Sequence, residues 1–206
     1  MRRFRFCVIV VAALCICPLF GTVADASPVT ITFAPLVGSN HDPYTGHVES
    51  GFTVTAVGGQ WFEAQVYGNP TPSIYSGPIG SPSQSAEITI ARGGQLFNLL
   101  SVDASFNNTI GSGTELRMFG HTPGGTTYLD AIGYQSSTSF DTYSFAYPSV
   151  SFDWIEIIVA LGPDSGTTSV NLDNIVLNTT AVPEPASLLL FGTGLVGMRA
   201  WRKRRP

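Results

Sequence analysis

Residues 27–180 consist of short runs rich in Val, Ile, Thr, Phe and Tyr, each bounded by Gly, Pro, Asn or Asp. Branched and aromatic residues favour an extended backbone, whereas the bounding residues favour turns. Nothing in this stretch has the 3.6-residue period of an amphipathic helix. The pattern therefore predicts an all-β domain made of short strands.

The spacing of these runs predicts the architecture of the domain. The expected strands are 29–34, 47–57, 61–67, 86–91, 95–106, 114–120, 126–135, 140–147, 150–161 and 168–178. Many short strands separated by turn residues are typical of antiparallel sandwiches, and a chain of this length can bury a single core. We predict an antiparallel β-sandwich, specifically a jelly roll, over residues 27–180.

Two expected strands break the strict alternation of apolar side chains. In one of them, the apolar residues occupy even positions up to Phe152 and Trp154, and odd positions from Ile155 onward. A similar change occurs at Asp173 and Asn174. Because side chains alternate along a strand, each change predicts a bulge or, for the first strand, burial on both faces.

The first 26 residues have the three parts of a secretory signal peptide. A basic start precedes the apolar stretch 6–20, and the small residues Ala24 and Ala26 form a cleavage site. All three cysteines lie within this segment. We therefore expect cleavage after Ala26, and an exported chain with neither a disulfide nor a catalytic thiol.

Charge is distributed unevenly along the chain. Residues 27–182 hold two basic residues against twelve acidic ones, which gives a net charge of −10. Such a surface repels phosphate backbones, so we expect no nucleic acid as a partner. Cations and neutral sugars remain compatible with this charge.

The C-terminal segment joins a Pro-Glu-Pro sequence to a short uncharged run and a basic end. The run 186–198, if helical, is about 20 Å long, whereas a bilayer core is about 30 Å thick. We predict a short membrane helix that holds the chain in the inner membrane only transiently. Pro183 and Pro185 keep Glu184 in an extended conformation that a processing enzyme can reach. The basic residues that should stay on the cytoplasmic side are Arg199, Arg202, Lys203, Arg204 and Arg205.

This order of features over residues 181–206 resembles a PEP-CTERM sorting signal. Proteins with that signal are exported by Gram-negative bacteria that make exopolysaccharide, and the membrane protease exosortase is thought to cut near the Pro-Glu-Pro. The resemblance implies an exosortase partner, an inner-membrane intermediate, and a final place at the cell surface or outside the cell. It also implies a structural or adhesive role in exopolysaccharide or biofilm.

The segment "SVNLDNIVL" resembles the closing strand of galactose-binding-like and carbohydrate-binding jelly rolls. That resemblance implies a structural calcium ion with Asp173 as one ligand, and we select Glu49 as the second. Calcium takes six to eight oxygen ligands, so two carboxylates alone do not complete a site. The alternative is that Asp173 caps a bulge and Glu49 faces solvent. We expect no other cofactor.

A proline-rich stretch, 67–85, lacks strand alternation and predicts a long surface loop. Trp61, Tyr67 and Tyr75 precede or flank it, and flat aromatic rings can stack on sugars. These three residues are our candidates for contact with an extracellular polysaccharide. The alternative is that Trp61 and Tyr67 belong to the core and that Tyr75 covers it.

Motifs for catalysis are missing from the sequence. It contains no G-x-S-x-G and no H-E-x-x-H, and nothing singles out a pair of acids for glycoside cleavage. His41, Asp42 and His47 share one loop and could hold a transition metal, although histidines in such loops are usually solvated. We predict a non-enzymatic protein. The alternatives are a carbohydrate-binding module and a glycan hydrolase.

Overall fold

The structure, a computed structural model, describes residues 27–77, 84–106, 114–133, 138–145, 150–161 and 169–179. The expected signal peptide with Ala24 and Ala26 lies outside the described residues, as does the whole segment from 180 to 206 with its Pro-Glu-Pro and basic end. Among the described residues, no helix has the length and apolar character needed to cross a membrane.

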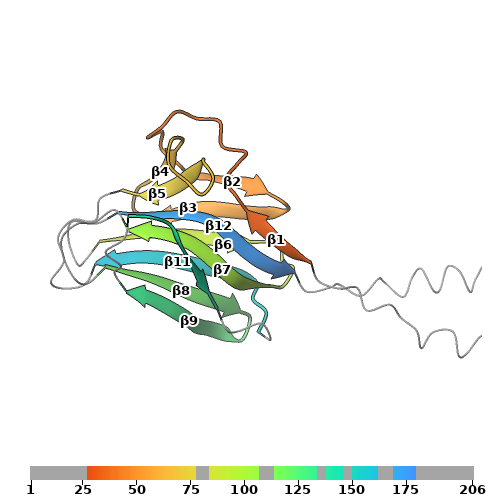
Figure 1. Cartoon of the computed structure of the whole chain (residues 1–206). Helices are drawn as coiled ribbons and strands as arrows, with labels where there is room; N and C mark the ends of the chain where they lie inside the picture. Colours follow the sequence, from red (N-terminus) through yellow and green to blue (C-terminus); the bar gives the residue numbers. More distant parts are fainter. Residues whose placement is uncertain are drawn as a thin grey trace, which may run out of the picture. The chain divides into compact units, whose positions relative to one another are not determined.

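Two antiparallel sheets of six strands each form the described part of the chain, which confirms the predicted all-β sandwich (Figure 1). The strands are β1 (Pro28–Ile31), β2 (Gly46–Glu49), β3 (Phe52–Gly58), β4 (Trp61–Ala64), β5 (Ser73–Ser76), β6 (Ser85–Ala91), β7 (Phe97–Phe106), β8 (Thr114–Thr122), β9 (Gly125–Gly133), β10 (Asp141–Ser144), β11 (Trp154–Leu161) and β12 (Val170–Thr179).

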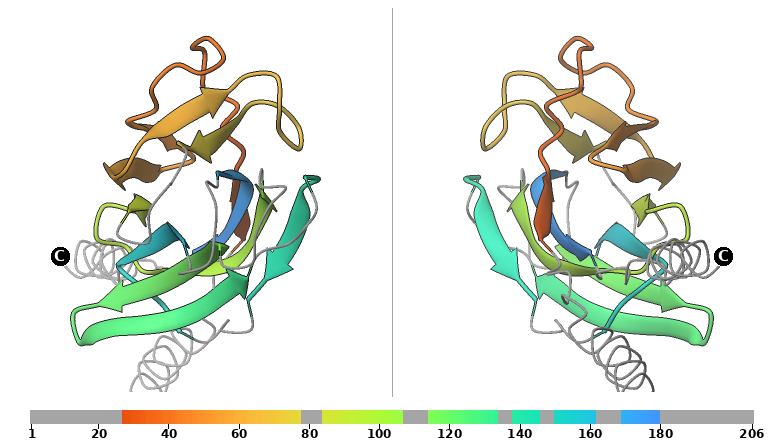
Figure 2. Two further views of the ribbon diagram at one scale, coloured as in Figure 1. Left: turned by 90° about the vertical axis from the view of Figure 1, so that its left-hand side faces the viewer. Right: turned by 90° about the vertical axis from the view of Figure 1, so that its right-hand side faces the viewer.

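The first sheet has the order β10-β7-β12-β5-β4, and β1 also pairs with β12. The second sheet has the order β2-β3-β6-β11-β8-β9. Strands β4 and β5 lie at one end of the domain and β8 and β9 at the other, as the two turned views also show (Figure 2).

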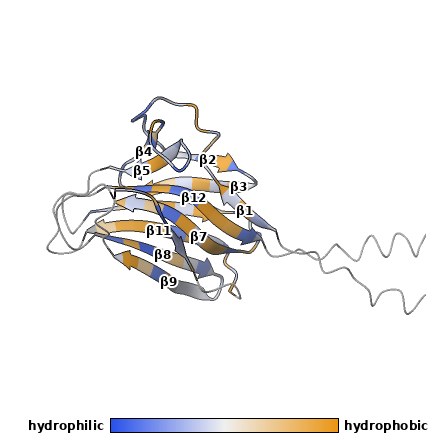
Figure 3. Cartoon of the chain, viewed as in Figure 1, coloured by the Kyte–Doolittle hydropathy of each residue, from blue (hydrophilic) through white to orange (hydrophobic). Residues whose placement is uncertain are grey.

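Between the sheets lies a core of alternating apolar side chains. Phe52 of β3 meets Phe97 of β7 edge to face, with ring centroids 5.0 Å apart, so the contact joins the two sheets. Each buried side chain of this size stabilises the fold by about 1.5–3 kcal/mol. Hydrophilic and hydrophobic residues share the same strands (Figure 3). This mixture is expected of a sandwich, because successive side chains of a strand point to opposite faces of its sheet.

Two predicted elements differ from the observed ones. The expected strand 47–57 is a hairpin of β2 and β3, because Ser50 and Gly51 have φ values of 52° and 82° and turn the chain. The stretch 67–85 is not all loop, since β5 pairs with both β4 and β12. Its Ile74 is fully buried opposite Leu172, and this tertiary contact makes the short segment a strand.

Only one of the two predicted bulges is present. Strand β12 loses its register with β7 after Asp173, and Asn174 has a φ of 41°, as predicted. Strand β11 begins at Trp154, keeps its register with both neighbours and buries only every second side chain over 154–160, so neither a bulge nor burial on both faces occurs there. Phe152 precedes the strand and forms a bridge with Phe97 of the first sheet, which explains its separate parity.

Candidate functional site

The outer face of the first sheet carries a row of four side chains from four adjacent strands. Phe62 of β4 lies opposite Tyr75 of β5, Tyr75 lies opposite Asn171 of β12, and Asn171 lies opposite Ser105 of β7. Their strand neighbours, such as Ile74, point into the core. The alternation of each strand therefore places aromatic, amide and hydroxyl groups side by side away from the core.

The loop between β4 and β5 brings Tyr67 onto this row. The Tyr67 hydroxyl bonds the Ser105 Oγ at 2.9 Å, and it donates a hydrogen bond to the carbonyl oxygen of Thr138. The Ser73 Oγ donates to the Tyr67 carbonyl oxygen at 2.7 Å. Tyr67 is thus held in place by side-chain and backbone contacts together.

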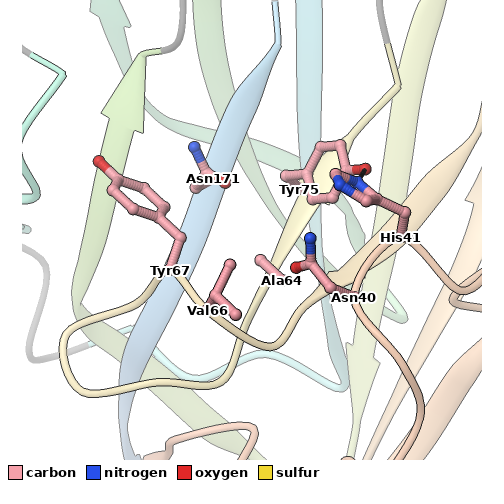
Figure 4. A pocket seen from close by; sticks show the side chains of 7 residues that line it. All are labelled: Asn40, His41, Ala64, Val66, Tyr67, Tyr75 and Asn171. Atoms are coloured by element: carbon pink, nitrogen blue, oxygen red, sulfur yellow. Dashed lines mark hydrogen bonds between the residues drawn. The ribbon is translucent and has the colours of Figure 1, made fainter.

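Tyr67 and Tyr75 stand on opposite sides of a pocket of about 330 Å³, with the Asn171 amide between them (Figure 4). The Tyr75 ring stacks on Phe62 at a centroid distance of 5.3 Å, and its hydroxyl lies 2.5 Å from the His41 Nδ1. Burial raises the pKa of Tyr75, so this hydroxyl keeps its proton at neutral pH. The other lining residues are Asn40, Ala64 and Val66.

Beside this row, Asp103 of β7 lies opposite Asp173 of β12. Asn69 joins the two acids, because its backbone N–H donates to Asp173 at 2.6 Å and its side-chain amide donates to Asp103 at 3.3 Å. Asn174 and Thr142 also donate to Asp103, at 2.8 and 2.6 Å. Both carboxylates are therefore engaged in holding the loop that carries Tyr67.

Burial raises the pKa of Asp173 to about 6. The negative charges of Asp103 and Glu49 act in the same direction, whereas the backbone N–H groups of Asn69 and Asn174 act against it. The Asp173 side chain is buried and Asp103 is only 6% exposed. Both carboxyl groups are thus hidden beneath the loop. The acid and base of a glycosidase must flank the scissile bond of the sugar, so this buried position does not suit that role.

Glu49 clasps the segment that follows β1. One carboxylate oxygen accepts from the backbone N–H of Thr32 at 3.0 Å and from its hydroxyl at 2.8 Å. The other accepts from Phe33 N–H at 3.0 Å and contacts the His47 Nε2 at 3.2 Å. Burial raises the pKa of Glu49, but these hydrogen bonds outweigh it and lower the pKa overall.

The contacts of Glu49 do not fit the predicted calcium ion. Four donors already use its oxygen lone pairs, and Asp173 accepts from two backbone N–H groups. Within the described ranges, no three acids, histidines or cysteines are grouped so that they could hold a metal. Glu49 is also not simply solvent-facing, since it is the acceptor that fixes the chain after β1. Calcium binding stays a prediction that these contacts do not support.

Of the three predicted glycan contacts, the structure brings two together. Tyr67 and Tyr75 line the same pocket, whereas Trp61 packs in the core between the sheets and does not line the pocket, so it is not placed to contact a ligand there. The two loop histidines enter different networks. His41 contacts Tyr75, and His47 contacts Tyr44 and Glu49.

Sequence reasoning did not identify Asn171, which lies between the two tyrosines. Asn171 is 2% exposed and its amide lies 3.4 Å from the Ser105 Oγ. A polar residue between Val170 and Leu172 in a buried strand was the available signal. It pointed to the outer face of the sheet, but the partner strands that complete the pocket could not be known.

The fold and the pocket define an antiparallel β-sandwich with an aromatic and amide site on one outer sheet face. Residues 181–205 match the PEP-CTERM protein-sorting motif. This match supports exosortase-dependent export and membrane-linked sorting toward the cell surface. No curated protein matches the chain.

Several solved structures show a distant likeness to the chain. One, described as a family 29 carbohydrate-binding module, has 14% identity and a TM-score of 0.45, covering 77% of this chain and 95% of that one. A CBM29-2 mutant complexed with mannohexaose has 15% identity and a TM-score of 0.42, with coverages of 78% and 96%. The family 32 module of C. perfringens NanJ, in complex with galactose, has 19% identity and a TM-score of 0.38, with coverages of 62% and 97%.

Proposed function

We propose that this protein is an exported, non-enzymatic surface protein that binds extracellular polysaccharide in the pocket between Tyr67 and Tyr75. The observation that carries the proposal is the arrangement of two tyrosine rings on opposite sides of a pocket, with the Asn171 amide between them. The ring faces suit the apolar C–H faces of a sugar, and the amide suits its hydroxyls.

The size and polarity of the pocket agree with a small polar ligand. Its volume of about 330 Å³ is at the lower end of the range of about 300–1,000 Å³ that is common for small-molecule sites. Asn40 and His41 add further polar groups to the apolar lining from Ala64 and Val66. A sugar unit, with its hydroxyl rim and apolar faces, matches this mixture.

The charge of the domain restricts the class of polysaccharide. Twelve acids against two basic residues over 27–182 disfavour a polymer of uronic acids or of phosphates, since like charges repel. A neutral polymer or one carrying amino groups does not meet this repulsion. We propose a neutral polysaccharide as the main ligand.

The C-terminal motif supplies the route by which the domain meets this ligand. We propose that the chain pauses in the inner membrane, is cut by exosortase near Pro183–Pro185, and reaches the cell surface or the matrix around it. A role in exopolysaccharide or biofilm cohesion follows from this place together with the pocket.

The test is binding of the exported protein, purified in mild detergent, to neutral polysaccharides and to the exopolysaccharide of the producing cell. Affinity electrophoresis should show retardation that Tyr75→Ala removes. The matched control is Trp154→Ala, which removes a partly exposed aromatic ring from the other sheet and should leave retardation unchanged. Loss of binding with the control but not with Tyr75→Ala would place the site elsewhere.

The same samples distinguish the alternative functions. Release of new reducing ends from the polysaccharide would identify a hydrolase and contradict the non-enzymatic proposal. A purely adhesive protein would show no retardation by any soluble polysaccharide, although its deletion would still weaken the biofilm.

A further inference from the structure

A second hollow also borders Tyr67. It has a volume of about 440 Å³, and it is lined by Tyr67, Gly68, Asn69, Thr138, Ser139 and Phe140. Tyr67 is the residue that it shares with the first pocket. The two hollows therefore adjoin at Tyr67, and we take its ring as the wall between them.

The second hollow combines the same kinds of groups as the first. The Phe140 ring lies 5.1 Å from the Tyr67 ring with an interplanar angle of 30°, so the hollow also has an aromatic side. Asn69, Thr138 and Ser139 contribute amide and hydroxyl groups. This mixture again suits a sugar unit more than an apolar ligand.

The dividing wall is held rigidly. The Tyr67 hydroxyl bonds the Ser105 Oγ and the Thr138 carbonyl oxygen, which ties it to β7 and to the segment before β10. Two residues further on, Asn69 is bonded to both buried acids, Asp103 and Asp173. A ring held in this way separates two binding positions at a fixed spacing instead of merging them.

We infer that the two hollows are neighbouring subsites of one groove, which binds an internal stretch of a linear, neutral oligosaccharide passing over Tyr67. This inference rests on the proposed function and specifies its ligand. A single sugar occupies one hollow, whereas a chain of several units contacts both. Binding of a chain interior suits a protein that must hold a long polymer without needing its end.

The experiment measures affinity against chain length by isothermal titration calorimetry, with gluco- and manno-oligosaccharides of one to six units. Affinity should rise with length until the chain spans both hollows. Phe140→Ala should weaken the longest binding oligosaccharide by roughly two- to tenfold. The same variant should leave the affinity for the shortest binding sugar unchanged.

A second variant keeps the test valid if Phe140→Ala disturbs Tyr67. Ser139→Trp places a large side chain in the second hollow while retaining Phe140. It should abolish the increase in affinity with oligosaccharide length and leave the affinity for the shortest binding sugar unchanged. Equal affinity for short and long chains, unaffected by both variants, would overturn the inference and leave the proposed function standing. If no oligosaccharide or polysaccharide bound, both proposals would fail together.

Discussion

Asp103 and Asp173 lie directly opposite each other on β7 and β12, and Asn69 donates a hydrogen bond to each of them. Two buried acids that accept hydrogen bonds from the same asparagine lie close together, so they would repel each other if both were ionised. Here the arrangement fastens the loop that carries Tyr67 to the sheet. The protonation and hydrogen bonding of these two buried acids are thereby coupled to the position of Tyr67 in the proposed binding groove.

The raised pKa of Asp173 predicts that stability depends on pH. Because the folded-state pKa of about 6 exceeds the ordinary value of 3.8, the folded protein holds this proton more tightly than the unfolded chain. The stabilisation is complete below the ordinary pKa and is lost as the pH rises through 6. Its upper limit is about 3 kcal/mol.

Urea unfolding from pH 4 to pH 7 measures this effect. Asp173→Asn, which cannot titrate, should show a free energy of unfolding that declines less over this interval than that of the unaltered protein. Asp130→Asn is the matched control, since it removes an exposed acid and should keep the original slope. Identical slopes for all three proteins would contradict the raised pKa.

Tyr67 and Tyr75 should respond differently to substitution. Tyr67→Phe removes a hydroxyl bonded to Ser105 and Thr138, so it should lower the free energy of unfolding by about 1–2 kcal/mol while retaining the stacking face. Tyr75→Ala should mainly weaken polysaccharide binding. Thermal unfolding measures the loss of stability and affinity electrophoresis measures the loss of binding, both on the same samples. A Tyr67→Phe protein as stable as the unaltered one would show that the hydrogen bonds of the Tyr67 hydroxyl contribute little.

Gly120 is required by the packing of Phe152. A Cβ at Gly120 would lie 2.3 Å from the Phe152 ring, so Gly120→Ala should destabilise the fold by about 1–3 kcal/mol. Gly133→Ala is the control, because nothing lies within 4 Å of the corresponding Cβ. The midpoint of urea unfolding should fall for the first variant and stay nearly constant for the second, and equal midpoints would refute the close contact.

The hydrogen bonds of Glu49 predict how the protein responds to calcium. Since four donors already occupy its carboxylate, neither calcium nor a chelator should shift the melting temperature. Glu49→Gln should lower it, because an amide NH₂ group would face the N–H groups of Thr32 and Phe33. A rise in melting temperature with calcium that Asp173→Asn abolishes would restore the sequence-based prediction of a metal.

The sorting motif predicts a processed product. Intact mass of the protein recovered from the cell surface should correspond to a chain that begins at Ser27 and ends near residue 183. Glu184→Ala should leave uncut precursor in the inner membrane, whereas Ser187→Ala, two residues after the Pro-Glu-Pro, should mature normally. Normal maturation of Glu184→Ala, with loss of the basic end, would show that Glu184 is not recognised.

Much of the architecture could be predicted because strand signals are local. Residues 86–91 and 168–178 were predicted as strands and correspond to β6 and β12, and the change at Asp173 marked a real bulge. The same reasoning failed at Phe152, since a bridge to Phe97 of the other sheet mimicked a bulge. Strand β5 was missed because its four residues become a strand only through pairing with β4 and β12.

The sequence by itself determined the class of fold and the C-terminal sorting motif, because both depend on residues that are close together in the chain. Only the tertiary structure decided that Trp61 belongs to the core while Tyr67 and Tyr75 share a pocket. It also decided that Asn171, about a hundred residues away, lies between them. The physical reason is that a binding site on a sheet face is built from residues of several strands. The order of those strands is set by the packing of the whole core.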